Sequence, residues 1–357
     1  MNESIYASGS STYESRDRAF YLLKKYTSAT LLTRAIDLYG EFLYHFEQAT
    51  TEQQNLNSSI PGQPVDYSDD LVSLLTYLEP MEYARPLLTQ TNKRREAFDA
   101  LKRGVRFVNF IWGRRYQESM AGEPGNLLYN MGYRWSPGES VDVFAKAALA
   151  ADLLSLGLTT TNKASRLYLL NPRETLETRT VMRWTYDSIF FASVRFNGVP
   201  PIVFPAQLSS CPPKNENNEG QVWSAQTIPE TGIWEPWPVD PSAGARCPNY
   251  YFAGDTASQY QMEGTDTFED VRWRLIWKDN RYVNGEIPDE EADYFGSLPT
   301  STVPIKRASH PGDVCPQSGK WYSNHLHKTI YLQAGDVMPG PEYSPSGNLV
   351  SWYLHDE

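Results

Sequence analysis

The chain has 357 residues, of which 40% are hydrophobic, so it is long enough for one large domain or two smaller ones with buried cores. No apolar run approaches the roughly 18 residues of a membrane-spanning helix, and the polar start MNESIYASGSSTYESRDR lacks the features of a secretory signal. Three cysteines without a CxxC pair argue against a disulfide framework, and a net charge of −11 argues against nucleic-acid binding. These features predict a cytoplasmic protein.

Helical periodicity dominates the first half of the chain. Apolar residues recur at steps of three and four over about residues 16–46, 68–80, 92–120, 141–157 and 162–196, with Ser28 as a predicted N-cap between two helices. The segment 92–120 is also strongly basic, which we interpret as a solvated face paired with acidic neighbours rather than as a nucleic-acid contact. We predict an all-helical domain over residues 1–197.

Beyond Pro200 the pattern changes, because proline, glycine and tryptophan become dense and long helical runs disappear. Residues 271–277 alternate as a strand does, and residues 281–283 follow a turn as a predicted partner strand. We predict a β-rich domain over residues 198–357, and therefore an α+β fold class.

All three cysteines precede a proline, at Cys211, Cys247 and Cys315. A glycine and then a tryptophan follow the first and the third, at Gly220 and Trp223 and at Gly319 and Trp321. This pattern predicts three degenerate copies of a hairpin unit, in which the cysteine is a small buried residue and the tryptophan fills the core.

The search for catalytic chemistry starts with His325 and His327, which lie two apart on a predicted strand and would share one face. With His310 or Asp313 they could contribute to a zinc site, but the spacing supplies only two of four ligands. We favour a polar strand face and predict no metal and no cofactor. The chain has no GxSxG elbow and no glycine-rich phosphate loop, so no catalytic residue is predicted.

A compact motif stands near the end of the chain, where CPQSGKW is followed by AGDVMP and a late tryptophan. Its main residues are Cys315, Pro316, Ser318, Gly319, Trp321, Gly335, Met338, Pro339 and Trp352. The motif resembles the C-terminal module of bacterial immunity proteins 71 and 72, which are encoded beside polymorphic toxins and toxins of type VI or related secretion systems. The resemblance implies a non-enzymatic cytoplasmic antidote that binds and blocks a cognate toxin.

The charge distribution suggests where a toxin would bind. Residues 1–200 carry 22 basic and 22 acidic side chains, whereas residues 201–357 carry 10 and 21. An acidic surface attracts a basic partner, although solubility alone would also explain the excess. The predicted toxin-binding residues are Asp266, Glu269, Asp270, Glu286, Asp289, Glu290, Glu291 and Asp293.

Two other functions remain open from the sequence. A hydrolase with its site at the domain interface would bring histidines and an acidic group together in a cleft. A structural adaptor would need no such cleft. The sequence indicates neither the identity of the toxin nor an oligomeric state.

Overall fold

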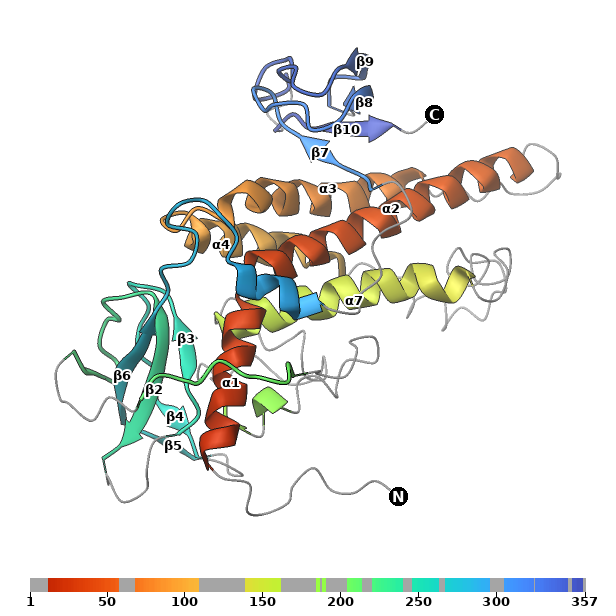
Figure 1. The fold of residues 1–357 in the computed structure, drawn as a ribbon. Helices are drawn as coiled ribbons and strands as arrows, with labels where there is room; N and C mark the ends of the chain where they lie inside the picture. Colours follow the sequence, from red (N-terminus) through yellow and green to blue (C-terminus); the bar gives the residue numbers. More distant parts are fainter. Residues whose placement is uncertain are drawn as a thin grey trace. The chain divides into compact units, whose positions relative to one another are not determined.

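The structure is a computed structural model, drawn in Figure 1. It describes residues 12–57, 68–108, 139–161, 184–186, 188–190, 204–213, 220–239, 246–262, 267–295, 305–323, 325–345 and 349–355. Helices come first along the chain and antiparallel strands follow, which confirms the α+β fold class. The predicted boundary between residues 197 and 198 lies outside the described residues and stays a prediction.

The chain forms two compact units, and each is assembled from separated segments. Unit 1 contains Met1–Leu32, Thr89–Arg95 and Asp152–Gly296, and unit 2 contains Thr33–Leu88, Glu96–Ala151 and Ser297–Glu357. Helical and strand segments therefore contribute to both units.

The helices follow from the apolar periodicity of the sequence. They are α1 (Thr12–Tyr26), α2 (Ala29–Asn57), α3 (Ser68–Ala84), the short 3₁₀ helix η1 (Arg85–Leu87), α4 (Arg94–Gly104) and α7 (Glu139–Thr160). Ser28 caps α2 as predicted, because its Oγ accepts a hydrogen bond from the N–H of Leu31 at 3.1 Å. The helix predicted over residues 92–120 is shorter, since α4 ends at Gly104 and the described residues stop at Val108.

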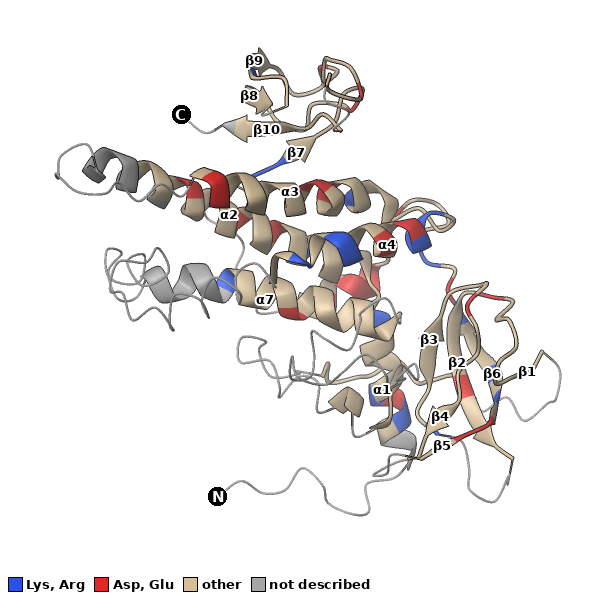
Figure 2. Cartoon of the chain, turned by 180° about the vertical axis from the view of Figure 1, so that it is seen from behind, with Lys and Arg blue, Asp and Glu red and all other residues tan. Residues whose placement is uncertain are grey.

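Unit 2 is built around an aromatic core on α2. The rings of Tyr39 and Phe107 lie 4.2 Å apart, and the hydroxyl of Tyr39 donates to the carbonyl of Leu74 on α3 at 2.8 Å. Gly104 lets α4 approach α3 closely, because a Cβ at this position would lie 2.5 Å from the Cγ of Met81. Residues of both charge signs occur along these helices (Figure 2).

The strands form two four-stranded antiparallel sheets and one two-stranded sheet. In unit 1 they are β1 (Val222–Trp223), β2 (Gly232–Pro238), β3 (Asn249–Tyr251), β4 (Tyr260–Gln261), β5 (Phe268–Glu269) and β6 (Val271–Lys278), followed by the 3₁₀ helix η4 (Asp289–Phe295). In unit 2 they are β7 (Ala308–Ser309), β8 (Gly319–Ser323), β9 (Lys328–Leu332) and β10 (Trp352–His355). The strand predicted at 271–277 is confirmed as β6.

The two four-stranded sheets repeat one topology and one register. Their strand orders are β1-β6-β2-β3 and β7-β10-β8-β9. Trp234 of β2 lies opposite Leu275 of β6, and Trp321 of β8 lies opposite Leu354 of β10. Both tryptophans are buried, and each indole N–H donates to the carbonyl oxygen four residues earlier, at 3.1 Å in both cases.

Matching hydrogen bonds also tie the loops of the two sheets. In each sheet a hydroxyl before the second strand accepts from an alanine N–H after the third strand, and a second tryptophan indole donates to a loop carbonyl. The pairs are Ala253 to Thr231 (2.9 Å) and Trp273 to Ser258 (2.7 Å) in the first sheet, and Ala334 to Ser318 (2.7 Å) and Trp352 to Pro339 (2.8 Å) in the second. We therefore describe two copies of one fold, module A (β1 to β6) and module B (β7 to β10).

The copies are related differently from the predicted repeat. The N–H of Gly335 donates to Cys315 (2.9 Å) in module B, and in module A the N–H of Gly254 donates to Ile228 (2.7 Å). Ile228-Pro229 thus occupies the position of Cys315-Pro316, and Cys211 lies elsewhere, as does Cys247. The fold needs a buried apolar residue before the proline at this position, and isoleucine meets that need as well as cysteine does.

Each module packs on a helix of its own unit. In unit 1, Arg16 of α1 donates to the buried carboxylate of Glu235 on β2, at 2.5 Å. In unit 2, the hydroxyl of Tyr353 on β10 donates to Glu79 of α3, and the ammonium of Lys306 donates to Glu47 of α2 at 2.6 Å. Cys315, Trp321, Met338 and Trp352 lie in the core of module B.

Candidate functional site

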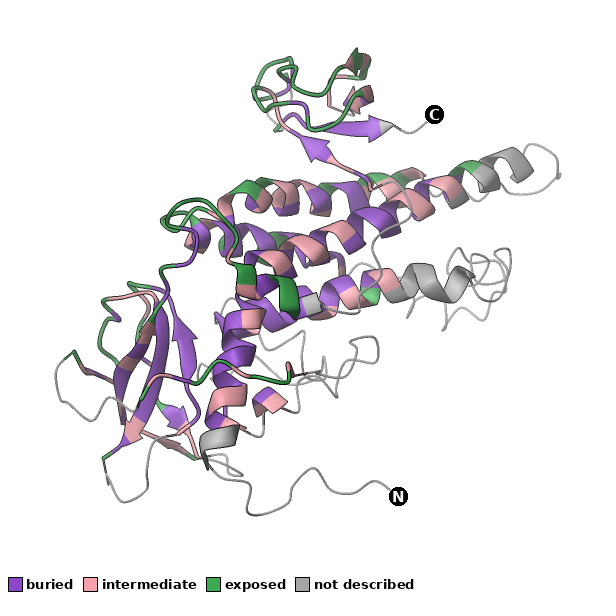
Figure 3. Ribbon diagram, viewed as in Figure 1, coloured by how far each residue is buried: buried purple, intermediate pink, exposed green. Residues whose placement is uncertain are grey.

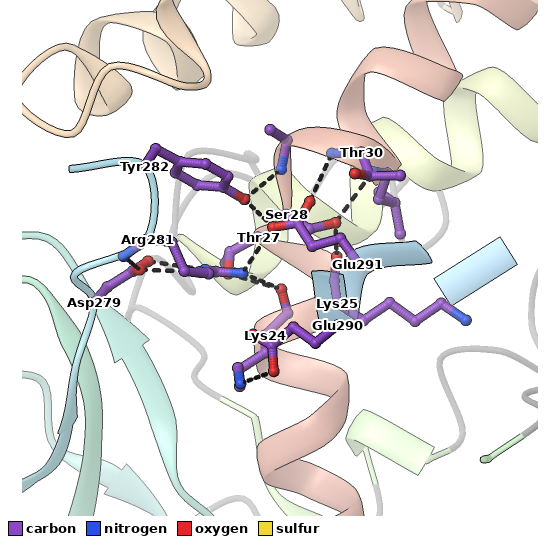
Figure 4. Close-up of polar contacts among 12 residues, drawn as sticks. Lys24, Lys25, Thr27, Ser28, Thr30, Asp279, Arg281, Tyr282, Glu290 and Glu291 are labelled. Atoms are coloured by element: carbon purple, nitrogen blue, oxygen red, sulfur yellow. Dashed lines mark hydrogen bonds and ion pairs between the residues drawn. The ribbon is translucent and has the colours of Figure 1, made fainter. Parts of the chain in front are cut away.

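The loop that follows β6 carries most of the predicted acidic residues, and a buried ion cluster fixes its start (Figure 4). The carboxylate of Asp279 is fully buried. It accepts hydrogen bonds from the guanidinium of Arg281 and from the hydroxyl of Tyr250, both at 2.8 Å, and from Arg94 of α4. Two guanidinium groups and a phenol therefore satisfy one carboxylate.

This cluster is strongly ionised. Burial alone would raise the pKa of Asp279, but the neighbouring Arg281 and Arg94 guanidinium groups outweigh burial and hold that pKa far below its ordinary value. Burial opposes the charge of Arg281 as well, and Asp279 nevertheless raises its pKa well above the ordinary value. Both groups are therefore charged at neutral pH, and their ion pair holds the start of the loop.

The loop is also joined to residues at the end of α1. Arg281 donates to the carbonyl of Lys24 and to the hydroxyl of Thr27, both at 2.8 Å. The ammonium of Lys24 in turn forms an ion pair with Glu290 on η4. Figure 4 shows these groups pointing toward one another from α1 and from the loop.

A second anchor connects the loop to the start of α2. The buried Glu291 carboxylate accepts from the hydroxyl of Tyr282 and from the N–H of Thr30, the latter at 3.1 Å. The same Tyr282 hydroxyl accepts from the N–H of Ala29 at 2.8 Å. These bonds use the N–H groups at the first turn of α2, which have no partner within the helix.

Tyr282 has a backbone φ of 64°, in the left-handed region that non-glycine residues rarely adopt. This conformation explains why residues 281–283 do not form the predicted partner strand, and that prediction is wrong. Strain of about 1–3 kcal/mol at such a residue persists only where the surroundings hold it, and here the two anchors do so.

Between the anchors, the loop presents apolar side chains to solvent. Val283 is 73% exposed and Ile287 is 52% exposed. Glu286, Asp289 and Asp293 are exposed around them. We call these five residues the exposed loop. Apolar groups surrounded by charged groups on a rigid backbone are typical of a protein–protein contact.

Two of the other predicted residues are already paired within the protein. Glu290 is half-buried beside Lys24. Glu291 is fully buried, with no exposed carboxylate to offer a partner. The expectation that Glu291 faces a toxin is therefore corrected: its charge stabilises the loop from inside.

The remaining predicted residues lie before β6. Glu269 is half-buried with a carboxylate oxygen 3.9 Å from the guanidinium of Arg246. Asp270 is exposed and accepts from the side-chain amide of Gln259 at 3.1 Å. Asp266 lies outside the described residues.

Sequence reasoning missed the parts of this site that depend on tertiary contacts. Arg94 and Arg95 pair with Asp279 and Asp255, as expected of a basic segment with acidic neighbours, but Arg94 is buried rather than solvated. No local pattern distinguishes Arg94 from its neighbours. The apolar residues at 283 and 287 were detectable as isolated hydrophobic positions in an acidic stretch.

The histidines at 325 and 327 do not share a strand face. His325 and His327 lie in the turn between β8 and β9, and not on a strand as predicted. His327 has a φ of 48°, which suits a turn. Within the described ranges, no group of three or more His, Cys, Asp or Glu side chains is placed to hold a metal ion.

No helix in the described part of the chain is long and apolar enough to cross a membrane.

Comparison with known families identifies the chain. A sequence model of the immunity protein 71 family matches residues 10–194, more than half of its length. The chain belongs to the immunity protein 71 family. A second model, for immunity protein 72, matches residues 213–295, a range that includes module A and the exposed loop. No curated protein and no solved structure matches the chain.

The matched ranges differ from the motif that suggested the family. The CPQSGKW motif begins at Cys315 in module B, beyond both matched ranges. Membership of the immunity protein 71 family therefore rests on the helical half of the chain. The match to immunity protein 72 falls on module A, of which module B is the second copy.

Proposed function

We propose that this protein is an antidote that binds and neutralises a cognate toxin by protein–protein contact, without catalytic activity of its own. The match to two immunity protein families over residues 10–194 and 213–295 carries the proposal. The toxin would be delivered by a type VI or related secretion system. The complex would form in the cytoplasm of the protected cell.

We place the toxin contact at the exposed loop. Its ends are fixed by the Asp279 cluster and by Glu291, so little conformational freedom would be lost on binding. Val283 and Ile287 provide apolar area at the centre of the contact. The surrounding carboxylates would steer a basic toxin surface.

Five further predicted residues have different places in this proposal. Glu269 and Asp270 extend the acidic surface before β6, and Glu290 contributes its half-buried carboxylate beside Lys24. Asp266 lies outside the described residues, and its part in the contact stays a prediction from the sequence. Glu291 is excluded from the contact because it is buried.

The first experiment is to mix the purified protein with the toxin domain encoded beside its gene. We expect a complex that survives size-exclusion chromatography, together with loss of the toxin's activity in the same mixture. An unrelated toxin domain is the specificity control. Separate elution with undiminished toxin activity would refute the proposal.

A further inference from the structure

Modules A and B share one fold, yet they expose different surfaces. In module A the edge strand β3 is buried at all three residues, Asn249–Tyr251. In module B the matching edge strand β9 is exposed or half-buried along its whole length. Figure 3 shows the difference in burial between the two modules. A five-residue edge strand with an open side offers unpaired backbone groups to a partner.

In module A a separate stretch of the same unit contacts β3. The side-chain amide of Asn249 on β3 donates to the carbonyl of Trp184 at 2.8 Å, and its oxygen accepts from the N–H of Trp184 at 2.7 Å. The Asn249 side chain thus holds this stretch against the strand and contributes to the burial of β3. Module B has Ile330 at the position of Asn249, and no such segment covers β9 in the described part of the chain.

The residue pair beside this position differs in the same way. In module A, Ile233 of β2 lies opposite Tyr250 of β3, and both are fully buried. In module B the matching pair is Lys320 and Tyr331, and Tyr331 is 62% exposed. The fold therefore allows this residue pair to be buried, but in module B Tyr331 is exposed.

A third difference lies in the loops. Each module has an isolated bridge at the same position, Thr227 with Thr256 in module A and Val314 with Val337 in module B. All four residues are exposed, and the two valines are 65% and 62% exposed. Because module A folds with threonine at these positions, the fold does not require valine there. Exposed apolar residues that a fold does not need are typical of a binding surface.

The charges beside β9 favour one kind of partner. Lys320 and Lys328 are both exposed near this edge. Lys328 is on the edge strand itself, where a lysine opposes pairing with a second copy of the same strand, and Lys320 is on the neighbouring strand β8. They attract acidic side chains instead, and opposite charges on adjacent strands stabilise a sheet.

We propose that the β9 edge of module B, flanked by Tyr331 and the Val314–Val337 pair, binds an extended segment of the toxin that carries apolar and acidic side chains. The segment adds a strand to the sheet, so backbone hydrogen bonds supply affinity and the exposed side chains supply specificity. This inference rests on the proposed function and adds a second contact surface to it.

Hydrogen exchange on the complex with the toxin domain tests both surfaces separately. We expect the amides of residues 328–332 that point away from β8 to exchange about tenfold or more slowly in the complex, because an added strand protects the outward-facing amides of the edge. Protection of residues 283–293 with unchanged exchange in β9 would overturn this inference and leave the proposed function intact. Absence of any complex would overturn both.

Matched substitutions in the two modules give a second test. Tyr331→Glu and Val337→Glu place a carboxylate on the proposed edge surface, and each should weaken toxin binding about tenfold or more. Thr256→Glu makes the same change at the module A position that matches Val337, and it should leave the Kd unchanged. All three side chains are exposed, so thermal unfolding should be little affected. Wild-type affinity in both module B variants would contradict the inference.

Discussion

At the scale of single residues, the protein uses buried charge to shape an exposed surface. Asp279 and Glu291 are carboxylates with no exposed area, and each fixes one end of the loop that presents Val283 and Ile287. The sequence predicts an acidic loop here but not which acids face inward. Which carboxylates face inward depends on Arg281 and on the N–H groups of residues 29 and 30. These two N–H groups lie about 250 positions from the loop in the sequence.

Removing the central carboxylate should destabilise unit 1. Asp279→Asn leaves the buried guanidinium groups of Arg94 and Arg281 without a counter-charge, which costs about 3 kcal/mol or more of unfolding free energy. Denaturant unfolding followed by tryptophan fluorescence measures the change. Asp289→Asn on the exposed side of the loop is the control, with an expected effect below about 0.5 kcal/mol. Equal stabilities of the two variants would show that the cluster does not stabilise the fold.

The exposed carboxylates should act mainly on the rate of association. Glu286→Lys combined with Asp293→Lys reverses two charges of the exposed loop and should slow toxin binding about tenfold at low salt. The difference should shrink above 0.1 M salt, where the Debye length falls below about 10 Å. Stopped-flow kinetics measures it, and Asp69→Lys on α3 is the control for a changed net charge. An on-rate independent of both loop charges and salt would rule out electrostatic steering.

At the scale of elements, the main finding is that one four-stranded module occurs twice. The Cys-Pro pairs predict three copies of a hairpin unit, whereas the fold aligns Ile228-Pro229 with Cys315-Pro316. Spacing of cysteines could not show this, because strand register and loop hydrogen bonds define the copies. The glycine before each core tryptophan, Gly232 or Gly319, was the more reliable marker.

Replacement of these two glycines by alanine should lower the unfolding free energy by different amounts. A Cβ on Gly232 would lie 2.1 Å from the carbonyl oxygen of Trp277, which belongs to the backbone of β6. A Cβ on Gly319 would lie 2.7 Å from a terminal methyl of Leu354, which can rotate away. Gly232→Ala should therefore cost about 2 kcal/mol of unfolding free energy, and Gly319→Ala should cost less. The reverse order in denaturant unfolding would contradict this steric account.

Helix α7 should make stability depend on pH. Burial raises the pKa of Asp152 to about 7, whereas the unfolded chain keeps the ordinary value near 4. The folded state then binds the proton more tightly than the unfolded state does. Ionisation of Asp152 therefore lowers the unfolding free energy progressively as the pH rises from about 4 to about 7, and the loss is complete above pH 7. Asp152→Asn should raise the melting temperature at pH 8 and leave it nearly unchanged at pH 4. An equal shift at both pH values would exclude the ionisation of Asp152 as the cause.

At the scale of the whole molecule, composition and periodicity predict more of the fold than of the binding surface. The helices near the N-terminus, the strand at 271–277 and the α+β class all follow from local patterns. The assembly of two units from interleaved segments does not, because it depends on contacts between residues such as Lys306 and Glu47. Family membership and the exposed loop together yield the proposed antidote function.

Growth rescue is the most direct measurement of that function. Cells expressing the toxin encoded beside the gene should survive when this protein is co-expressed. The double variant Val283→Asp with Ile287→Asp should accumulate to the same level and fail to protect, because both side chains are exposed and only the contact is lost. Toxin-induced death in the presence of the wild-type protein would contradict the antidote function, and full protection by the double variant would contradict the place assigned to the contact.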